Sequence, residues 1–279
     1  MTLDEKEAKL TDILIGYGSV AVAWSGGVDS TFLSAYAHEV LEGRVLLINA
    51  RSAAFPDEEA EFVEGFASAR GIPLKVVETH ELDNEDYKSN PTNRCYFCKT
   101  EMYGTLRPIA EEAGMAVLLD GANIEDFKSD FRPGHQAAEE WDVKHPLRDA
   151  EMTKADIRTL SKSMGLPTWD KPAFACLASR FPYGEYLDEY KLKRVADAET
   201  VMRQMNFKIF RVRSHDDLAR IEIGEDEIER GFQERHQLIE KLKALGFFWV
   251  TIDMQGFRSG SMNEAITGFR VQSQHEPMA

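Results

Sequence analysis

Two glycines stand between an apolar run and an amphipathic segment near the N-terminus, in the hexapeptide SGGVDS at residues 25–30. Because glycine has no side chain, backbone N–H groups at such a turn can approach an anion closely. A helix that begins near Ser30 would add the positive end of its dipole. Ser25 and Ser30 can donate hydrogen bonds, and Asp29 can cap the helix or help to hold Mg²⁺. The pattern indicates phosphate binding, but a plain tight turn with an N-cap would use the same residue types.

The chain has three cysteines, Cys95, Cys98 and Cys176. Two residues separate the first two, a spacing that lets both thiolates bind one metal ion or cluster. Zinc usually takes four ligands, whereas a 4Fe–4S cluster held by three cysteines keeps one iron open for another sulfur ligand. A buried or redox-active Cys-x-x-Cys at a helix start is an equal alternative. The odd number does not suggest a disulfide framework.

Cys176 follows a predicted fifth strand, so we expect it at the same sheet edge as the glycine loop. The neighbouring Lys171 and Arg180 would favour its thiolate form, which is the reactive one. A single cysteine among small residues is more often part of a core. Its predicted location beside the nucleotide site favours a functional role.

Arg211 and Arg213 alternate on a predicted strand and therefore share one face. Two guanidinium groups on one face suit a phosphate or a carboxylate through bidentate pairing. The alternative is a ladder of arginines paired with acidic residues such as Glu222. Arg180, Arg258 and Ser259 are weaker candidates for the same pocket.

Apolar runs that alternate with helical patterns predict how these residues are positioned. Buried strands separated by helices indicate an α/β fold with a parallel sheet covered on both faces, which binds ligands at the carboxyl ends of its strands. The predicted strands span 19–24, 44–49, 74–79, 115–120 and 166–169, and the predicted helices span 30–41, 56–70, 99–113 and 153–164.

The pattern changes after residue 184 to one typical of a smaller α+β unit. Pro182 and Gly184 mark the connection, and we place the boundary near residue 180, which gives domains 1–180 and 181–279. The predicted helices of the second part span 188–205 and 225–245, and its predicted strands span 207–213, 218–223 and 247–253.

The charge balance favours a small ligand. The 279 residues include 33 Lys and Arg against 48 Asp and Glu, a formal net charge of -15. Nucleic-acid binding depends on Lys and Arg that neutralise phosphates, so this balance argues against a polynucleotide partner. Without an apolar run of membrane-spanning length or a secretory signal, the expectation is a cytoplasmic protein with no membrane partner.

The hexapeptide at residues 25–30 resembles the signature of the PP-loop ATP pyrophosphatases, whose loop holds the pyrophosphate of ATP. This resemblance implies an adenine site at the strand ends, for which Ala23, Ser52 and Gly121 are the positional candidates. Further motifs resemble the LarE family of sulfur transferases over nearly the whole chain. They are DGAN at 120–123, DFRPG at 130–134, CLASRFPYG at 176–184, FRVRSHDDLARIEI at 210–223 and GFRSGSMN at 256–263.

The resemblance implies a PP-loop domain of the adenine nucleotide alpha hydrolase type, followed by a smaller substrate-binding and oligomerisation domain. It implies ATP- and Mg²⁺-dependent adenylation of the carboxylates of pyridinium-3,5-biscarboxylic acid mononucleotide, and their conversion to thiocarboxylates for the nickel-pincer nucleotide. Members with one cysteine give up its sulfur, whereas members with three hold a 4Fe–4S cluster, as this chain's pattern implies. A homo-oligomer is expected.

The residue roles carried by these arguments fall into four sets. The catalytic candidates are Cys176 and Asp29. The ATP-binding candidates are Ala23, Ser25, Gly26, Gly27, Asp29, Ser30, Ser52 and Gly121. The substrate-binding candidates are Arg180, Arg211, Arg213, Arg258 and Ser259. The metal candidates are Cys95, Cys98 and Cys176 for the cluster, together with Glu199, which would otherwise be a solvated helix charge. The alternative functions are a tRNA thiolation enzyme, an ammonia-using amidating ligase and a nucleotide-sensing partner protein.

Overall fold

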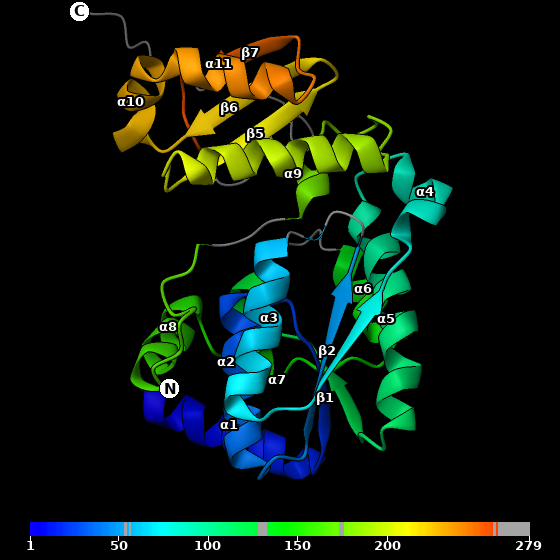
Figure 1. Ribbon diagram of the computed structural model, residues 1–279. Coiled ribbons are helices and arrows are strands. Elements are labelled where there is room, and N and C mark those ends of the chain that lie inside the picture. Colours follow the sequence, from blue (N-terminus) through cyan, green and yellow to red (C-terminus); the bar gives the residue numbers. More distant parts are fainter. Residues whose placement is uncertain (53–54, 56, 128–132, 173–175, 259–260, 262–279) are drawn as a thin grey trace, which may run out of the picture. The chain divides into compact units, whose positions relative to one another are not determined.

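The computed structural model describes residues 1–52, 55, 57–127, 133–172, 176–258 and 261 (Figure 1). The chain divides into two compact units, each described here by itself. The first unit comprises Met1–Ala175 and Tyr183–Lys193, and the second comprises Cys176–Pro182 and Arg194–Ala279. The domain boundary near residue 180 stays a prediction.

The first unit contains a four-stranded parallel sheet, which confirms the predicted α/β fold. The strands are β1 (Val20–Ala23), β2 (Val45–Arg51), β3 (Leu74–Glu78) and β4 (Val117–Leu119), in the order β3-β2-β1-β4. Val20 of β1 pairs with Val45 on one side and with Val117 on the other. The chain therefore leaves β1 toward β2 and later returns to its opposite side as β4. Such a reversal opens a crevice at the carboxyl ends of the two strands.

Helices cover both faces of this sheet (Figure 1). Successive strand residues pack on opposite sides, since Leu47 belongs to one apolar cluster and Ile48 to the other. One face packs against α1 (Leu3–Tyr17), α2 (Val28–Val40), α3 (Asp57–Arg70), α7 (Pro146–Asp149) and α8 (Lys154–Ser163). The other face packs against α5 (Arg94–Glu112) and α6 (Pro133–Glu140). The short elements η1 (Glu81–Asp83), α4 (Glu85–Lys88) and η2 (Ile124–Phe127) connect them.

The predicted fifth strand over 166–169 is wrong, because these residues form turns. The guanidinium of Arg158 donates to the carbonyl oxygens of Trp169 and Lys171 at 2.7 and 2.8 Å. The backbone N–H of Lys171 donates to the carbonyl oxygen of Thr168 at 3.0 Å, which closes a turn. These local contacts use carbonyl groups that a strand would present to a neighbouring strand. The expected position of Cys176 after a fifth strand loses its basis.

The second unit is the small α+β unit that the pattern predicted. It contains η3 (Leu177–Arg180), most of α9 (Glu189–Gln204), β5 (Phe210–His215), β6 (Leu218–Ile223) and β7 (Trp249–Ile252). β5 is antiparallel to β6, whereas β7 is parallel to β6. The single helix predicted over 225–245 is divided into η4 (Glu225–Glu227), α10 (Ile228–Gln233) and α11 (Arg235–Ala244). The division falls at Glu234, whose ψ angle of 7° lies outside the α-helical range.

No helix in the described ranges combines the length and the apolar character that a membrane span requires.

Candidate active site

The glycine loop joins β1 to α2 at the crevice between β1 and β4. Gly26 has a φ of 74°, which a residue with a side chain rarely adopts. The Ser25 and Ser30 hydroxyls lie 3.1 Å apart across the turn. Gly27 is the N-cap of α2, and no side chain in the described part of the chain caps this helix. The first N–H groups of α2 are therefore directed at the space in front of the loop, as anion binding requires.

A pocket of about 570 Å³ opens at this loop, a volume in the range of small-molecule sites. Beyond the loop, its wall comes from the ends of β2 and β4, from α5 and from the start of α8. Six of the predicted ATP-binding residues line it: Ala23, Ser25, Gly27, Asp29, Ser30 and Gly121.

The other two predicted ATP-binding residues, Gly26 and Ser52, are not among the described residues that line the pocket. Gly26 accepts a hydrogen bond on its carbonyl oxygen from Lys171 Nζ at 3.3 Å. Ser52 is not among the described residues that line the pocket, and its side chain is hydrogen-bonded to Glu81. The ATP-binding role of Ser52 stays a prediction.

Asp29 is the loop's ionisable group, and its two oxygens differ. Oδ2 accepts hydrogen bonds from Lys154 Nζ at 2.5 Å and from the Asn123 amide at 3.4 Å. Oδ1 is buried and has no hydrogen-bond partner among the described residues. Burial raises the pKa of Asp29, although the neighbouring Lys154 opposes this shift. A buried oxygen of this kind on a pocket wall fits a cation such as Mg²⁺.

Three lysines from separate segments also line the pocket: Lys99, Lys154 and Lys171. Lys171 Nζ lies 2.6 Å from Glu59 and 4.7 Å from the centre of the Phe62 ring. The sequence patterns assigned no nucleotide role to any of the three, because none belongs to the glycine loop. The sequence offered a signal for Lys99 alone, because it directly follows Cys98 of the Cys-x-x-Cys pair.

Gly121 touches the start of α2. A Cβ atom at this position would lie 2.8 Å from the Ser30 backbone nitrogen and 3.0 Å from its Cα. Gly121→Ala is therefore expected to displace the loop and weaken ATP binding by about 10- to 100-fold, since displacements near 1 Å have such effects. Isothermal titration with ATP measures the change. Gly16→Ala is the matched control, because nothing lies within 4 Å of a Cβ there; equal ATP affinity for the two variants would contradict this role of Gly121.

Cys95 and Cys98 lie at the start of α5 in the first unit, while Cys176 directly precedes η3 in the second. One helical turn separates Cys95 from Cys98, so both thiols lie on one face of the helix. The charge of Cys98 contributes, after burial and Asp120, to the raised pKa of Tyr103 in the pocket wall. No group of three or more His, Cys, Asp or Glu side chains within the described part of the chain is placed to hold a metal ion.

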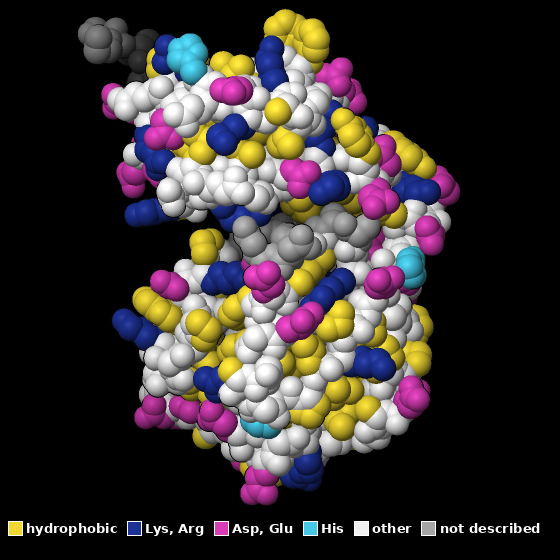
Figure 2. All heavy atoms as spheres, viewed as in Figure 1, with side chains coloured by type: hydrophobic (Ala, Val, Ile, Leu, Met, Phe, Trp, Pro, Cys, Tyr) yellow, Lys and Arg dark blue, Asp and Glu magenta, His cyan; other side chains and the backbone are white. Residues whose placement is uncertain are grey.

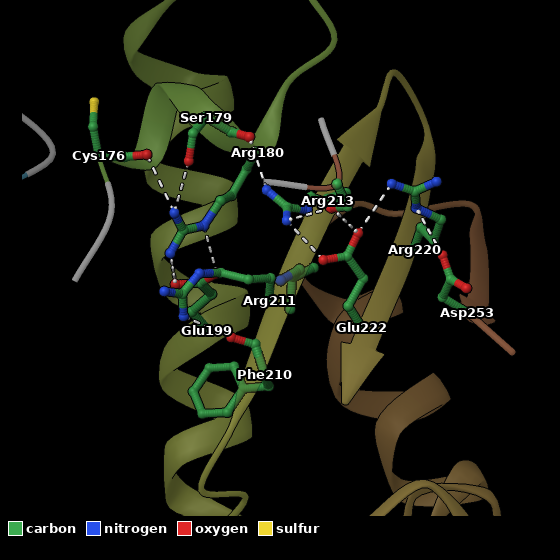
Figure 3. A network of polar contacts seen from close by, with 12 residues as sticks. Cys176, Ser179, Arg180, Glu199, Phe210, Arg211, Arg213, Arg220, Glu222 and Asp253 are labelled. Carbon is green, nitrogen blue, oxygen red and sulfur yellow. Dashed lines mark hydrogen bonds and ion pairs between the residues drawn. The ribbon is translucent and has the colours of Figure 1, made fainter. Parts of the chain in front are cut away.

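The second unit contains a buried network of arginines and glutamates (Figure 3). Arg180 is fully buried, and its Nε and Nη2 donate to the two oxygens of Glu199 at 2.7 and 2.8 Å. Glu199 is thus the counter-ion of Arg180, and its predicted metal role stays a prediction. The carbonyl group of Cys176, rather than its sulfur, is turned toward Arg180, at 3.2 Å from Nη1 (Figure 3).

Arg213 has the acidic partner that the alternative interpretation required. Its Nη2 lies 2.7 Å from Glu222 and 3.1 Å from the Ser261 hydroxyl, and its Nη1 donates to the carbonyl oxygen of Ser179 at 2.9 Å. Arg220 also reaches Glu222, at 3.1 Å.

Arg211, on the same strand, differs from Arg213. Burial, followed by the charge of Arg180, lowers its pKa to about 10. A guanidinium whose charge is disfavoured in this way would be stabilised by an added anion. Arg258 is described, but Ser259 and residues 130–132 of the DFRPG motif lie outside the described residues.

Comparison with known proteins places the chain in a family. No family model matches it. It is 40% identical over 266 residues to an uncharacterized protein of Synechocystis sp., covering 94% of this chain and 99% of that protein. It is 36% identical over 267 residues to the pyridinium-3,5-bisthiocarboxylic acid mononucleotide synthase of Lactiplantibacillus plantarum, covering 95% of this chain and 96% of that enzyme. The chain belongs to the family of this synthase, the LarE family.

Part of this LarE-family chain is also similar to a PP-loop enzyme with another activity. One subunit of a glutamine-hydrolysing GMP synthase from Sulfurisphaera tokodaii is 25% identical over 178 residues, which cover 59% of this chain and 47% of the GMP synthase polypeptide. The similarity to this PP-loop enzyme therefore covers only part of the LarE-family chain.

On the face of the molecule drawn in Figure 2, Lys and Arg side chains lie among Asp and Glu side chains. Within each unit, the described residues drawn there do not form the continuous basic stripe that polynucleotide binding uses.

Proposed function

We propose that this LarE-family chain adenylates the carboxylates of pyridinium-3,5-biscarboxylic acid mononucleotide with ATP and then converts them to thiocarboxylates. The observation that carries the proposal is that α5 contains both two cysteines and residues that line the pocket. This helix holds Cys95 and Cys98 in its first turns, and from Lys99 onward it forms part of the pocket that contains the glycine loop. One helix thus holds two thiols and, from Lys99 onward, supplies residues to the wall of the pocket that contains the phosphate-binding loop. The product name of the Lactiplantibacillus plantarum relative supports the same substrate class.

In the proposed adenylation, an oxygen of the substrate carboxylate attacks the α-phosphorus of ATP and pyrophosphate leaves. The N–H groups at the start of α2 and the glycine loop bind the departing phosphates. Lys154 and Lys99 add positive charge, and Oδ1 of Asp29 would hold Mg²⁺. The acyl-adenylate has AMP as its leaving group, which a sulfur nucleophile displaces.

Arg211 and its neighbours support binding of the substrate's anionic groups by the second unit. Arg180 and Arg213 are held in place by Glu199 and Glu222. Burial and the charge of Arg180 disfavour the charged form of Arg211, so an added phosphate or carboxylate would stabilise it. Arg258 and Ser259 stay weaker candidates for the same role.

We further propose that Cys95, Cys98 and Cys176 hold a 4Fe–4S cluster. Two thiols one turn apart at a helix start form a donor pair of the kind that such clusters use, and Cys176 would be the third ligand. The group would supply an iron on which the transferable sulfide binds. ATP, Mg²⁺ and this cluster are the proposed cofactors, Cys176 is the proposed catalytic cysteine, and a cytoplasmic homo-oligomer stays a prediction.

Mass spectrometry tests the proposed function directly. Anaerobically purified protein, incubated with ATP, Mg²⁺, sulfide and the biscarboxylated nucleotide, is expected to give a mass gain of about 16 for each oxygen replaced by sulfur, with one AMP released per replacement. Alanine at Cys95, Cys98 or Cys176 is expected to remove the iron and the thiocarboxylate together. Release of AMP and pyrophosphate should persist in the Cys95 and Cys98 variants, because those thiols do not take part in adenylation.

Two other outcomes would contradict the proposal. An amide product in the presence of ammonia, with no thiocarboxylate from sulfide, would favour an amidating ligase, the class to which the GMP synthase similarity points. Salt-sensitive binding of total tRNA in a gel-shift titration would favour tRNA thiolation. Full iron content and activity in any of the three alanine variants would refute the cluster alone.

A further inference from the structure

One buried carboxylate on the pocket wall receives four donors. Oδ1 of Asp120 lies 2.6 Å from His145 Nδ1 and accepts from the Ala122 backbone N–H at 3.1 Å. Oδ2 accepts from the Tyr103 hydroxyl at 2.7 Å and from Lys99 Nζ at 3.3 Å. Burial alone would raise the pKa of Asp120, but the His145 hydrogen bond and the Lys99 charge lower it on balance. The group is therefore a carboxylate that accepts on both oxygens.

The donors to Asp120 come from three separate segments of the chain. The Ala122 bond closes the turn that contains Gly121, and Gly121 packs against the Ser30 backbone at the start of α2. Lys99 and Tyr103 belong to α5, one residue and five residues after Cys98. His145 precedes α7 and lines no part of the pocket among the described residues, yet it is 3% exposed and makes the shortest bond to the carboxylate.

We propose that His145 is a positioning residue for the adenylation step, which it controls through Asp120. The Nδ1–H donor fixes the carboxylate plane, so that Lys99 stays over the pocket and the Gly121 turn stays against the phosphate loop. This inference rests on the proposed use of ATP by the same pocket. Nothing in the glycine loop or the cysteine pattern points to His145, which comes from a part of the chain 25 residues beyond Asp120.

Two amide variants of His145 separate the effect of losing the Nδ1–H donor from the effect of changing the size of the side chain. His145→Asn places an amide nitrogen near the position of Nδ1, whereas His145→Gln places it near that of Nε2. The readout is the KM for ATP and the kcat of pyrophosphate release, measured with the biscarboxylated nucleotide. We expect His145→Asn to stay within about threefold of the wild type in both constants. For His145→Gln we expect a KM for ATP raised by about 10-fold or more, since one hydrogen bond to a charged group corresponds to such a factor.

The KM distinguishes positioning from a general loss of structure, because a reduced amount of folded enzyme lowers the apparent kcat and leaves KM unchanged. Tyr103→Phe provides a second route if His145→Gln does not fold. It removes one donor from the other oxygen of Asp120 and should raise the KM for ATP in the same direction by about threefold to 10-fold. His236→Gln, at an exposed site on α11, is the control and should change nothing.

Equal KM values for the Asn and Gln variants, or a wild-type KM in both His145→Gln and Tyr103→Phe, would overturn the proposal. Failure of the proposed function is distinguishable, because wild-type protein would then release no pyrophosphate from ATP. A KM for ATP that is raised in His145→Gln but stays near the wild-type value in His145→Asn would support the proposal.

Discussion

Asp29→Asn is expected to slow ATP-dependent pyrophosphate release by about 100- to 1000-fold, the range found when one group that stabilises charge in a transition state is removed. The carboxylate lines the pocket with one buried oxygen that has no partner among the described residues, and that oxygen is the proposed Mg²⁺ ligand. An amide oxygen carries no formal charge and would bind the ion weakly. Steady-state release of pyrophosphate, measured over a Mg²⁺ titration, gives both the rate and the Mg²⁺ concentration required.

The folded structure should tolerate this change. Burial disfavours the charged form of Asp29 and raises its pKa, so Asn is expected to leave the unfolding transition nearly unchanged. Asp142→Asn is the control, because Asp142 is exposed and pairs with Lys144 away from the pocket. A wild-type rate for Asp29→Asn at low Mg²⁺ would eliminate the proposed cation role.

The second large effect concerns stability. Glu199→Gln would remove the negative charge of a fully buried ion pair with Arg180, which typically costs about 3–5 kcal/mol in the free energy of unfolding. Urea denaturation followed by far-UV circular dichroism measures the loss. The two units need not unfold together, so the transition assigned to the second unit is the relevant one.

A double variant and a control complete this experiment. Arg180→Met combined with Glu199→Leu removes both charges, and it is expected to be more stable than Glu199→Gln alone. Glu234→Gln breaks a partly exposed pair with Arg230 in the same unit and should change the transition little. Equal transitions for Glu199→Gln and Glu234→Gln would show that the Arg180–Glu199 pair contributes no more than a surface pair.

The sequence was sufficient for the features that depend on local pattern. The four strands of the first unit are short apolar runs bounded by turns, and all four lie where the pattern predicted them. The glycine loop falls between β1 and α2 for the same reason. Parallel strands place their carboxyl ends together, so the approach of Gly121 to the loop followed from the fold class.

The features that the patterns missed depend on side-chain contacts that no local motif marks. The run at 166–169 has the composition of a strand, but the side chain of Arg158 binds its backbone and no neighbouring strand among the described residues does. Lys154 reaches Asp29 across 125 positions of sequence, and no motif marks it. Glu222 was named from the sequence as a possible arginine partner. The register of β5 with β6 places it opposite Arg211, but its 2.7 Å ion pair with Arg213 depends on side-chain directions that alternation alone does not reveal.

Helix α5 has a consequence for how this chain can vary in length. Its thiols and its pocket residues lie on one continuous helix, in which each residue advances about 1.5 Å and turns about 100°. Removal or insertion of a single residue between Cys98 and Tyr103 would rotate the thiols by about 100° relative to the pocket residues that follow. The thiols and the pocket residues could then no longer both keep their present directions. We therefore expect insertions and deletions to be excluded from this stretch and confined to the connections before Arg94 and after Glu112.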